Sequence, residues 1–223
     1  MWTMKIAKPL FQAVLISVLF TCILWWIKLS ELFFHLPLNE LGISPMQVQG
    51  LWGIAFAPLI HGSLGHIFSN TLALLFLGSL FIYGYPHSWK KASLLIWLGS
   101  GLGVWLFARH AVHIGASGLT HGLFFFLLVA SILRRDKRSV ALMMMGVVLY
   151  GGMMMSIFPR EEHISFEYHF FGALFGALAA LLFSRADPKP VIKRFTWEES
   201  PELEDPIIGE QWRQSSSDDA SNQ

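Results

Sequence analysis

The chain has a single cysteine, Cys22, among 223 residues, so no disulfide can form within it. Charge is also scarce: charged residues make up 14% of the chain and the formal net charge is +1, so we expect no nucleic-acid partner. Hydrophobic residues make up 54%, with 19 Phe and 9 Trp, and the mean hydropathy is +0.51. This composition is typical of an integral membrane protein rather than a soluble enzyme.

Long apolar stretches account for most of the sequence. A helix needs roughly 20 mostly apolar residues to cross a hydrocarbon core about 30 Å thick. Six segments approach that length: 9–29, 52–83, 92–107, 117–133, 140–158 and 166–183. The second is long enough that its first residues should lie in the interface or in a bend before the span. The sequence therefore predicts an all-α, polytopic membrane protein with six transmembrane helices.

The first apolar segment resembles a secretory signal, because Lys5 and Lys8 precede it. No small-x-small cleavage site follows, and the apolar run is longer than the core of a usual signal peptide. We therefore expect this segment to remain as the first transmembrane helix.

Lysine and arginine are distributed unequally between the two sides of the predicted helices. If the N-terminus is cytoplasmic, 13 of the 16 basic residues lie inside, and Lys28, Arg109 and Arg160 lie outside. Because basic residues accumulate on the cytoplasmic side, we expect both termini in the cytoplasm. The small size suggests a bacterial inner membrane.

The end of the chain differs in composition from the rest. Residues 186–223 contain nine acidic and four basic residues and end in a run rich in serine and aspartate. Such a composition is typical of a disordered segment. We expect a six-helix membrane domain at 1–185 and an acidic, disordered cytoplasmic tail at 186–223.

Several polar residues lie inside the apolar segments, where they are rare unless they have a use. In the predicted orientation, Ser117 and His169 each begin a helix from the outer face. His61, His66 and Asn70 lie near the outer end of the second helix. These five residues should therefore share one depth in the membrane.

Ser117 stands at the predicted start of its helix, between Gly115 and Gly118. A serine hydroxyl becomes a good nucleophile when a base takes its proton and hydrogen-bond donors receive the oxyanion. Backbone N–H groups at a helix start are free for that purpose, and the two glycines let a substrate approach closely. A serine N-cap beside a glycine turn is the structural alternative.

His169 is the candidate base for Ser117. Small-residue ridges let two helices pack closely, which could bring the Ser117 hydroxyl within about 2.6 to 3.2 Å of the imidazole. The alternative is that the glycines only pack helices and His169 makes an interhelical hydrogen bond. The ridge pattern Gly-x-x-x-Gly occurs on both helices, at Gly118, Gly122, Gly172 and Gly176.

His66 and Asn70 are four residues apart and should lie on one helix face. Both carry N–H donors of the kind an oxyanion hole needs. His61 should lie about 140° around the same helix and is interpreted as a structural histidine. The spacing of the two histidines differs from that of a zincin helix, and no cysteine or acidic ligand is near, so we expect no metal and no cofactor.

At these positions the sequence resembles the rhomboid family of intramembrane serine proteases. The resemblance implies six helices around a water-filled outer cavity, a Ser117 and His169 dyad without an acid, and an oxyanion hole from His66, Asn70 and the Ser117 N–H. It implies substrates that are transmembrane segments of single-span proteins, and a segment at about 32–51 lying partly in the outer leaflet. The motifs are His61-Gly-Ser-Leu-Gly-His66-Ile-Phe-Ser-Asn70, Gly115-Ala-Ser117-Gly118 and His169-Phe-Phe-Gly172-Ala-Leu-Phe-Gly176.

The sequence departs from the family pattern at two places. Trp52-Gly53 replaces the usual Trp-Arg, so an arginine that helps to hold the first loop is missing. His121 replaces the aromatic or apolar residue that packs on the catalytic histidine. It could stack on His169 as a neutral ring or raise the cost of charging it. The run from Ser117 to Gly122 is also similar to the rhombosortase branch of the family.

Two other functions fit parts of the pattern. A rhomboid-like protein that binds transmembrane clients without cutting them would keep the fold and the cavity. A six-helix transporter would use the intramembrane polar residues as substrate ligands. The transporter is disfavoured because the sequence has no inverted repeat and its acidic residues near the last outer loop, Glu161, Glu162 and Glu167, are not intramembrane.

Overall fold

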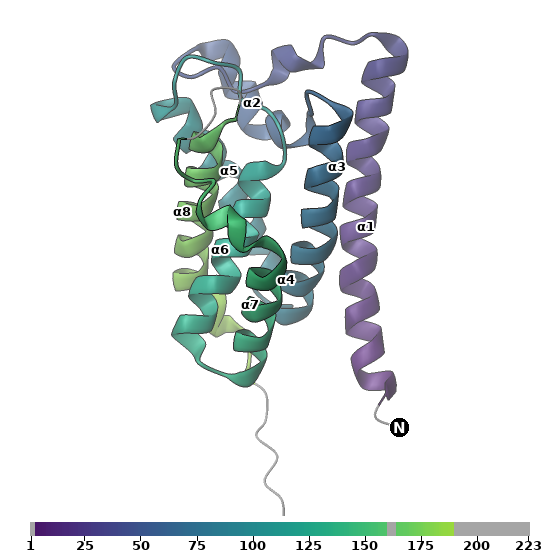
Figure 1. Ribbon diagram of the computed structural model, residues 1–223, viewed down its shortest axis with the longest axis vertical. Helices are drawn as coiled ribbons and strands as arrows, with labels where there is room; N and C mark the ends of the chain where they lie inside the picture. The colour runs from purple at the N-terminus through teal and green to yellow at the C-terminus, as the bar shows by residue number, and fades with distance from the viewer. Residues whose placement is uncertain (1–2, 160–163, 190–223) are drawn as a thin grey trace, which may run out of the picture. The chain divides into compact units, whose positions relative to one another are not determined.

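The computed structural model describes residues 3–159 and 164–189, with side chains from residue 8 onward. This part of the chain is helical and contains no β-strand, which confirms the predicted all-α class (Figure 1). The predicted acidic tail lies outside the described residues from residue 190 onward. The helices are α1 (Thr3–Phe34), α2 (Leu51–Phe56), α3 (Leu64–Ala73), α4 (Ser79–Gly84), α5 (Trp89–Phe107), α6 (Ser117–Arg134), α7 (Lys137–Tyr150) and α8 (Phe166–Phe183).

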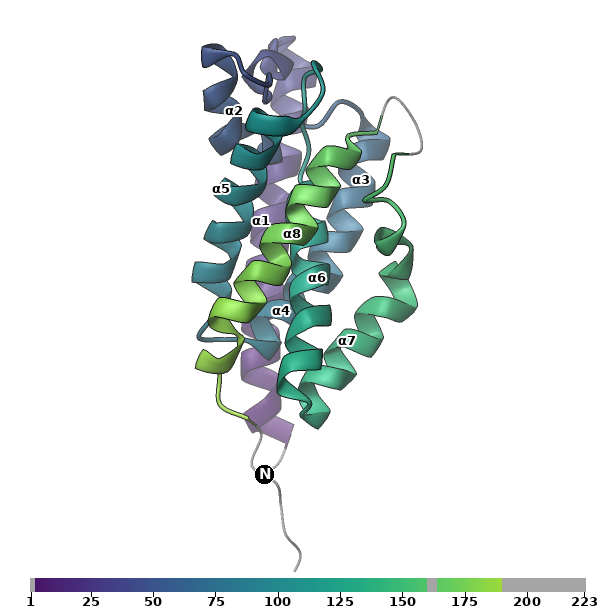
Figure 2. The ribbon, with the colours of Figure 1, turned by 90° about the vertical axis from the view of Figure 1, so that its left-hand side faces the viewer.

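Four stretches of the described chain are long and apolar enough to cross a membrane. They are Lys8–Phe34, Leu64–Gly84, Ser117–Arg134 and Phe166–Ala186. Helix α5 has 19 residues but begins with two lysines after its first residue, and α7 has 14 residues. Both run alongside the four spans in the bundle (Figure 2). The protein is therefore a multi-pass membrane protein whose described part forms a helical bundle.

The second predicted segment, 52–83, is not one helix. Helix α2 and a 3-10 turn at Ala57–Leu59 come first, and the chain then bends before α3 begins at Leu64. The Ser63 hydroxyl starts α3 by accepting a hydrogen bond from the backbone N–H of His66 at 3.0 Å. The predicted bend is present. The helical position predicted for His61 is wrong, because His61 lies in the bend before the helix.

The fifth predicted segment, 140–158, also ends earlier than expected. Helix α7 stops at Tyr150 and a short 3-10 helix, Gly151–Met154, follows it. Two consecutive glycines, Gly151 and Gly152, disfavour continuation of the α-helix because glycine loses the most backbone entropy there. Residues 155–158 therefore form a turn that leads back toward α8.

Helices α6 and α8 are in close contact along their glycine ridges. A Cβ atom on Gly172 would overlap the carbonyl oxygen of Gly118, and a Cβ on Gly176 would overlap that of Gly122. The two backbones therefore touch, as the small-residue pattern predicts. This contact fixes the separation between the starts of the two helices.

The loop between α1 and α2 is held by its backbone. Ile43 and His113 exchange two backbone hydrogen bonds of 2.9 Å, and Met46 N donates to the Trp105 carbonyl at 2.9 Å. A Cβ at Gly53 would overlap the backbone of Gly42 and Ile43. The loop backbone therefore occupies the space that the Cβ of an arginine at position 53 would need. The backbone hydrogen bonds of Ile43 and Met46 hold the loop instead of an arginine side chain.

A buried polar cluster closes the opposite end of the bundle. The Arg134 guanidinium donates to the carbonyl oxygens of Ser184 and Asp187, both at 2.6 Å, and pairs with the Asp136 carboxylate at 2.9 Å. The Asp187 residue is 3% exposed, and its carboxylate accepts from the backbone N–H of His87 and of Ser88. The predicted domain boundary after residue 185 therefore falls within the packed part of the chain.

Candidate active site

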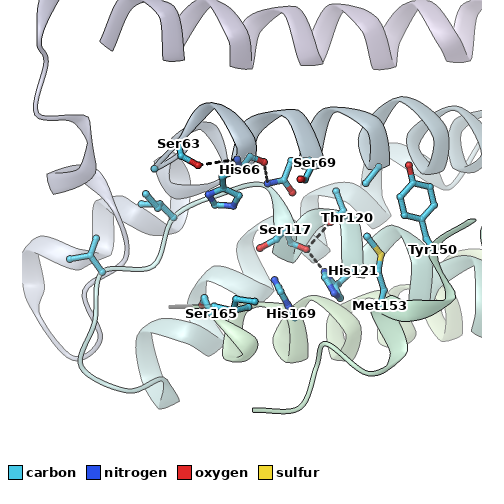
Figure 3. Close-up of a pocket in the computed structure, with 16 residues that line it drawn as sticks. Ser63, His66, Ser69, Ser117, Thr120, His121, Tyr150, Met153, Ser165 and His169 are labelled. Atoms are coloured by element: carbon cyan, nitrogen blue, oxygen red, sulfur yellow. Dashed lines mark hydrogen bonds between the residues drawn. The ribbon is translucent and has the colours of Figure 1, made fainter. Parts of the chain in front are cut away.

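A cavity of about 710 Å³ lies where α3, α6 and α8 begin (Figure 3). Ser117, His66, Asn70, His121 and His169 all line this cavity. The sequence predicts that four of these residues share one depth in the membrane, and the structure brings their side chains to one space. His61 does not line the cavity and lies behind His66.

Ser117 is the first residue of α6 and is half-buried. Its N–H lies outside the ladder of helical hydrogen bonds, as in the first turn of any helix. Its carbonyl oxygen accepts hydrogen bonds from the Thr120 hydroxyl at 2.9 Å and from His121 Nδ1 at 2.7 Å. Its Oγ makes no hydrogen bond with any described residue, so the hydroxyl is available in the cavity.

Gly115 shapes the turn that leads into Ser117. Its φ angle of +110° lies in a region that side-chain-bearing residues rarely adopt, and its N–H donates to the Ala57 carbonyl at 2.9 Å. A Cβ at this position would lie 2.5 Å from Cε1 and Nε2 of His66. Glycine therefore allows both the turn and the position of the His66 ring beside it.

His66 and Asn70 lie on one face of α3, four residues apart. The Asn70 amide donates one hydrogen bond to the His66 carbonyl at 3.1 Å, and its side chain is largely buried. An amide nitrogen carries two protons, so Asn70 keeps a second donor for the cavity. His66 and Asn70 thus present N–H groups on the wall of the cavity, across from α8.

His61 supports this wall from behind. Its ring meets that of His66 edge to face, with centroids 5.1 Å apart, and its Nε2 accepts a hydrogen bond from the Ala116 N–H at 3.4 Å. Burial, with the nearby His66 as a second cause, lowers the pKa of His61 to about 3. The ring therefore stays neutral and continues to accept the bond from the residue before Ser117.

His169 lies in the first turn of α8. Its Nδ1 is 3.0 Å from the backbone carbonyl oxygen of Ser156. A carbonyl can only accept a hydrogen bond, so Nδ1 carries the proton and the Nε2 of the neutral ring has a free lone pair. No hydrogen bond joins the Ser117 hydroxyl and His169 among the described residues, although both line the same cavity. In ligand-free sites such contacts are often long and tighten when substrate binds.

His121 lies one turn after Ser117 and stacks on His169. The ring centroids are 4.0 Å apart and the planes differ by 9°. Its Nδ1 bonds to the Ser117 carbonyl at 2.7 Å, and its Nε2 lies 2.7 Å from the Ser156 hydroxyl. The i to i+4 spacing predicts that His121 lies near Ser117. No sequence signal marks Ser156, which lies in a turn after an apolar segment.

A second pair of residues, His113 and Ser165, ties together the segments that lead into α6 and α8. His113 Nδ1 lies 2.6 Å from the Ser165 hydroxyl, and its Nε2 donates to the Arg109 carbonyl at 3.1 Å. Arg109 also pairs with the Glu167 carboxylate at 3.3 Å. His113 and Ser165 precede Ser117 and His169 by four residues each, so this contact aligns the two helix starts. The contact between His113 and Ser165 depends on the path of the two loops, which local sequence patterns do not predict.

Within residues 3–159 and 164–189, no group of three or more His, Cys, Asp or Glu side chains is placed to hold a metal ion.

The fold and the cavity define a multi-pass helical membrane protein in which Ser117 and three histidines line one cavity. Comparison with known families shows which class this is: the Rhomboid domain model matches residues 48–186, and the chain belongs to the rhomboid family. The matched region contains all of the cavity residues named above.

Curated relatives come from mycobacteria. An uncharacterized protein of Mycobacterium tuberculosis is 33% identical over 179 residues, which cover 76% of this chain and 75% of the relative. An uncharacterized protein of Mycobacterium leprae is 30% identical over 194 residues, which cover 82% of this chain and 76% of the relative. The names of these relatives state no activity.

Proposed function

We propose that the protein is an intramembrane serine endopeptidase that cleaves transmembrane segments of single-span membrane proteins near the outer face. The observation that carries this proposal is the orientation of His169 in the cavity of Ser117. The Ser156 carbonyl holds the Nδ1 proton of His169, so Nε2 is the basic atom in the cavity that also contains the Ser117 hydroxyl. A nucleophile with a correctly oriented base is the minimal requirement for acyl transfer.

In this reaction Ser117 Oγ adds to the scissile carbonyl carbon, and His169 Nε2 takes the hydroxyl proton. The developing oxyanion accepts hydrogen bonds from the Ser117 N–H, the Asn70 amide and the His66 ring. The C–N bond then breaks, and the imidazolium of His169 gives its proton to the leaving amine. Water, activated by the same imidazole, hydrolyses the acyl-enzyme and restores the free serine.

The substrate must unwind before it reaches Ser117. A transmembrane helix keeps its carbonyls hydrogen-bonded, so cleavage requires a local break in the helix near the outer end of the segment. The cavity suits this step because its lining includes the polar residues Ser63, Ser69 and Thr120, beside which an unwound substrate backbone is less costly than in lipid. Helix-destabilising residues at the cleavage site should therefore favour turnover.

The proposed orientation places the cavity at the outer face of the membrane. Basic residues gather at the helix ends that would be cytoplasmic if the N-terminus is inside, and the positive-inside rule favours this orientation, with both termini in the cytoplasm. We expect the location to be a bacterial inner membrane, with substrates that present a single span to the enzyme.

Labelling with a fluorophosphonate probe tests the proposal, since such probes react with activated serines. The purified protein in detergent micelles should be labelled, and Ser117→Ala and His169→Ala should abolish the signal while the thermal unfolding profile remains. Ser69→Ala is the matched control, because Ser69 lines the same cavity but its hydroxyl donates to the Gly65 carbonyl at 3.0 Å. Labelling that persists in Ser117→Ala would overturn the proposed dyad.

The alternative is a rhomboid-like protein that binds transmembrane clients without cutting them. One observation favours it: the Ser117 hydroxyl and His169 are not hydrogen-bonded to each other in the described structure. Absence of labelling in a folded wild-type protein, together with capture of a single-span peptide, would favour this function over proteolysis.

A further inference from the structure

Ser156 contacts both stacked histidines, although it lies on neither of their helices. It follows the 3-10 helix Gly151–Met154, in the turn that leads from α7 toward α8. Its backbone carbonyl lies 3.0 Å from His169 Nδ1, and its hydroxyl lies 2.7 Å from His121 Nε2. One residue therefore meets two imidazoles through two different groups.

The partners fix the protonation of both rings. The Ser117 carbonyl can only accept, so His121 Nδ1 is the donor and Nε2 of the neutral ring needs a donor in turn. The Ser156 hydroxyl has one proton and two acceptors within reach, the Met153 carbonyl at 3.0 Å and His121 Nε2 at 2.7 Å. Because only donation to the nearer Nε2 gives the neutral His121 ring a partner on each nitrogen, we assign the proton to that bond. The Ser156 carbonyl likewise requires His169 Nδ1 to be the donor. Both rings are therefore held in the same tautomer.

These contacts connect the nucleophile to the base by a continuous path. The path runs from the Ser117 carbonyl to the His121 ring, to the Ser156 hydroxyl, and through the backbone of Ser156 to the His169 ring. The 9° angle between the planes of the stacked rings shows that the two imidazoles are aligned by this arrangement. In a Ser-His-Asp triad, a carboxylate orients the imidazole and fixes its tautomer.

We propose that Ser156 is the positioning residue of the dyad: its carbonyl orients His169, and its hydroxyl, bonded to His121, holds that carbonyl in place. This inference rests on the proposed function, because it gives Ser156 the role of orienting His169 that a carboxylate has in a Ser-His-Asp triad. It also explains why histidine is useful at position 121, where an apolar ring would stack but would not bind the Ser156 hydroxyl.

Variants at two positions test the coupling. Ser156→Ala keeps the carbonyl and removes the hydroxyl, and it should slow fluorophosphonate labelling about fivefold to tenfold, the scale of one lost hydrogen bond. Ser156→Thr keeps a hydroxyl and should stay within about twofold of wild type. In a His121→Phe background, Ser156→Ala should cost less than about twofold, because the bond is already gone.

Equal losses from Ser156→Ala in both backgrounds would overturn the proposal, as would no loss in either. A thermal unfolding profile for each variant separates slow labelling from loss of fold.

A spectroscopic readout makes the test independent of activity. In the protein labelled with ¹⁵N-histidine, the nitrogen shifts of His169 and His121, assigned through the His169→Ala and His121→Phe variants, should report protonated Nδ1 in both rings. Ser156→Ala should shift the Nε2 signal of His121. A His169 ring protonated at Nε2 would overturn the proposal. If wild type were not labelled by the probe but showed these shifts, the proposed protease function would fail while the positioning contacts stood.

Discussion

At the scale of single residues, the surroundings of His169 differ from what its apolar helix suggests. One face of its ring is covered by the His121 ring, and its Nδ1 is bonded to a backbone carbonyl. Both contacts restrict rotation of the imidazole before substrate arrives. Restricting a catalytic group in advance lowers the entropy that must be lost when the transition state forms.

Replacing His121 by phenylalanine tests whether stacking is its main contribution. The new phenyl ring would cover the same face of His169, so labelling of Ser117 should remain within about tenfold of wild type, the scale of one lost hydrogen bond. The rate of fluorophosphonate labelling measures this. Complete loss in a folded protein would show that His121 has a chemical role of its own.

Asn70→Ala tests the oxyanion wall. If Asn70 is an oxyanion donor as proposed, its loss should lower the cleavage rate of a transmembrane substrate by roughly 10²-fold, because the amide would stabilise charge that develops in the transition state. Turnover measured in micelles or liposomes provides the check, with binding of the uncut substrate as the control. A loss of about twofold or less would mean that Asn70 acts in packing.

At the scale of elements, the proposed dyad depends on how closely α6 and α8 approach. The glycine ridges bring the two backbones into contact, and the His113 and Ser165 contact aligns the helix starts. The distance between Ser117 and His169 is therefore set by contact between the two backbones. Long side chains between the helices could change conformation to accommodate a shift, but a backbone contact cannot.

Gly172→Ala tests this dependence. The added Cβ would overlap the Gly118 carbonyl, so α8 must shift, and we expect a destabilisation of about 1–3 kcal/mol with loss of Ser117 labelling. Thermal unfolding and probe labelling measure the two effects. Gly152→Ala is the matched control, because no atom lies within 4 Å of its added Cβ. Equal behaviour of the two variants would contradict the backbone contact.

Local patterns in the sequence predicted the elements that carry Ser117 and His169, because helix starts, glycine ridges and i to i+4 pairs depend on nearby residues. They did not predict Ser156 or the His113 and Ser165 contact, since these join segments through the path of a loop. The wrong helical position of His61 has the same cause: its place depends on a bend whose geometry the apolar composition did not indicate.

At the scale of the whole molecule, the two ends of the bundle have different chemistry. The loop between α1 and α2 and the starts of α6 and α8 lie at one end, and the turn between α6 and α7 lies at the other (Figure 1). The first end carries the cavity, and the second carries the buried Arg134 cluster. This asymmetry agrees with the orientation proposed from the basic residues.

Single cysteines in a Cys22→Ala background test the orientation. In intact cells, a membrane-impermeant maleimide should label Glu40→Cys, which lies in the exposed loop between α1 and α2. It should label Lys137→Cys, at the start of α7, only after the cells are permeabilised. The reverse pattern would place the cavity at the cytoplasmic face.

Acid should destabilise the whole domain. Burial lowers the pKa of His61 to about 3, so its ring stays neutral in the fold while it takes up a proton in the unfolded chain below about pH 6.5. Burial also lowers the pKa of His113, which acts in the same direction. The unfolded state then binds more protons, and the free energy of unfolding should fall by up to about 1.4 kcal/mol per pH unit for His61.

Thermal unfolding between about pH 7 and pH 5 measures this effect, since this window brackets the pKa of an unfolded histidine. His61→Asn removes one titrating ring and should show a shallower decline than wild type. An unfolding temperature that rises on acidification would contradict the neutral state of these rings.

The span from Leu64 to Gly84 contains a π-helical stretch at Leu74–Gly78. Such a stretch holds one more residue than an α-helix would, and it separates the cavity-facing half with His66 and Asn70 from the half that ends at Gly84. Deleting one residue within 74–78 should restore a continuous α-helix without turning either half. A deletion elsewhere in the span would rotate one half by about 100°. Relatives that differ in the length of this span are therefore expected to gain or lose their residue at this stretch.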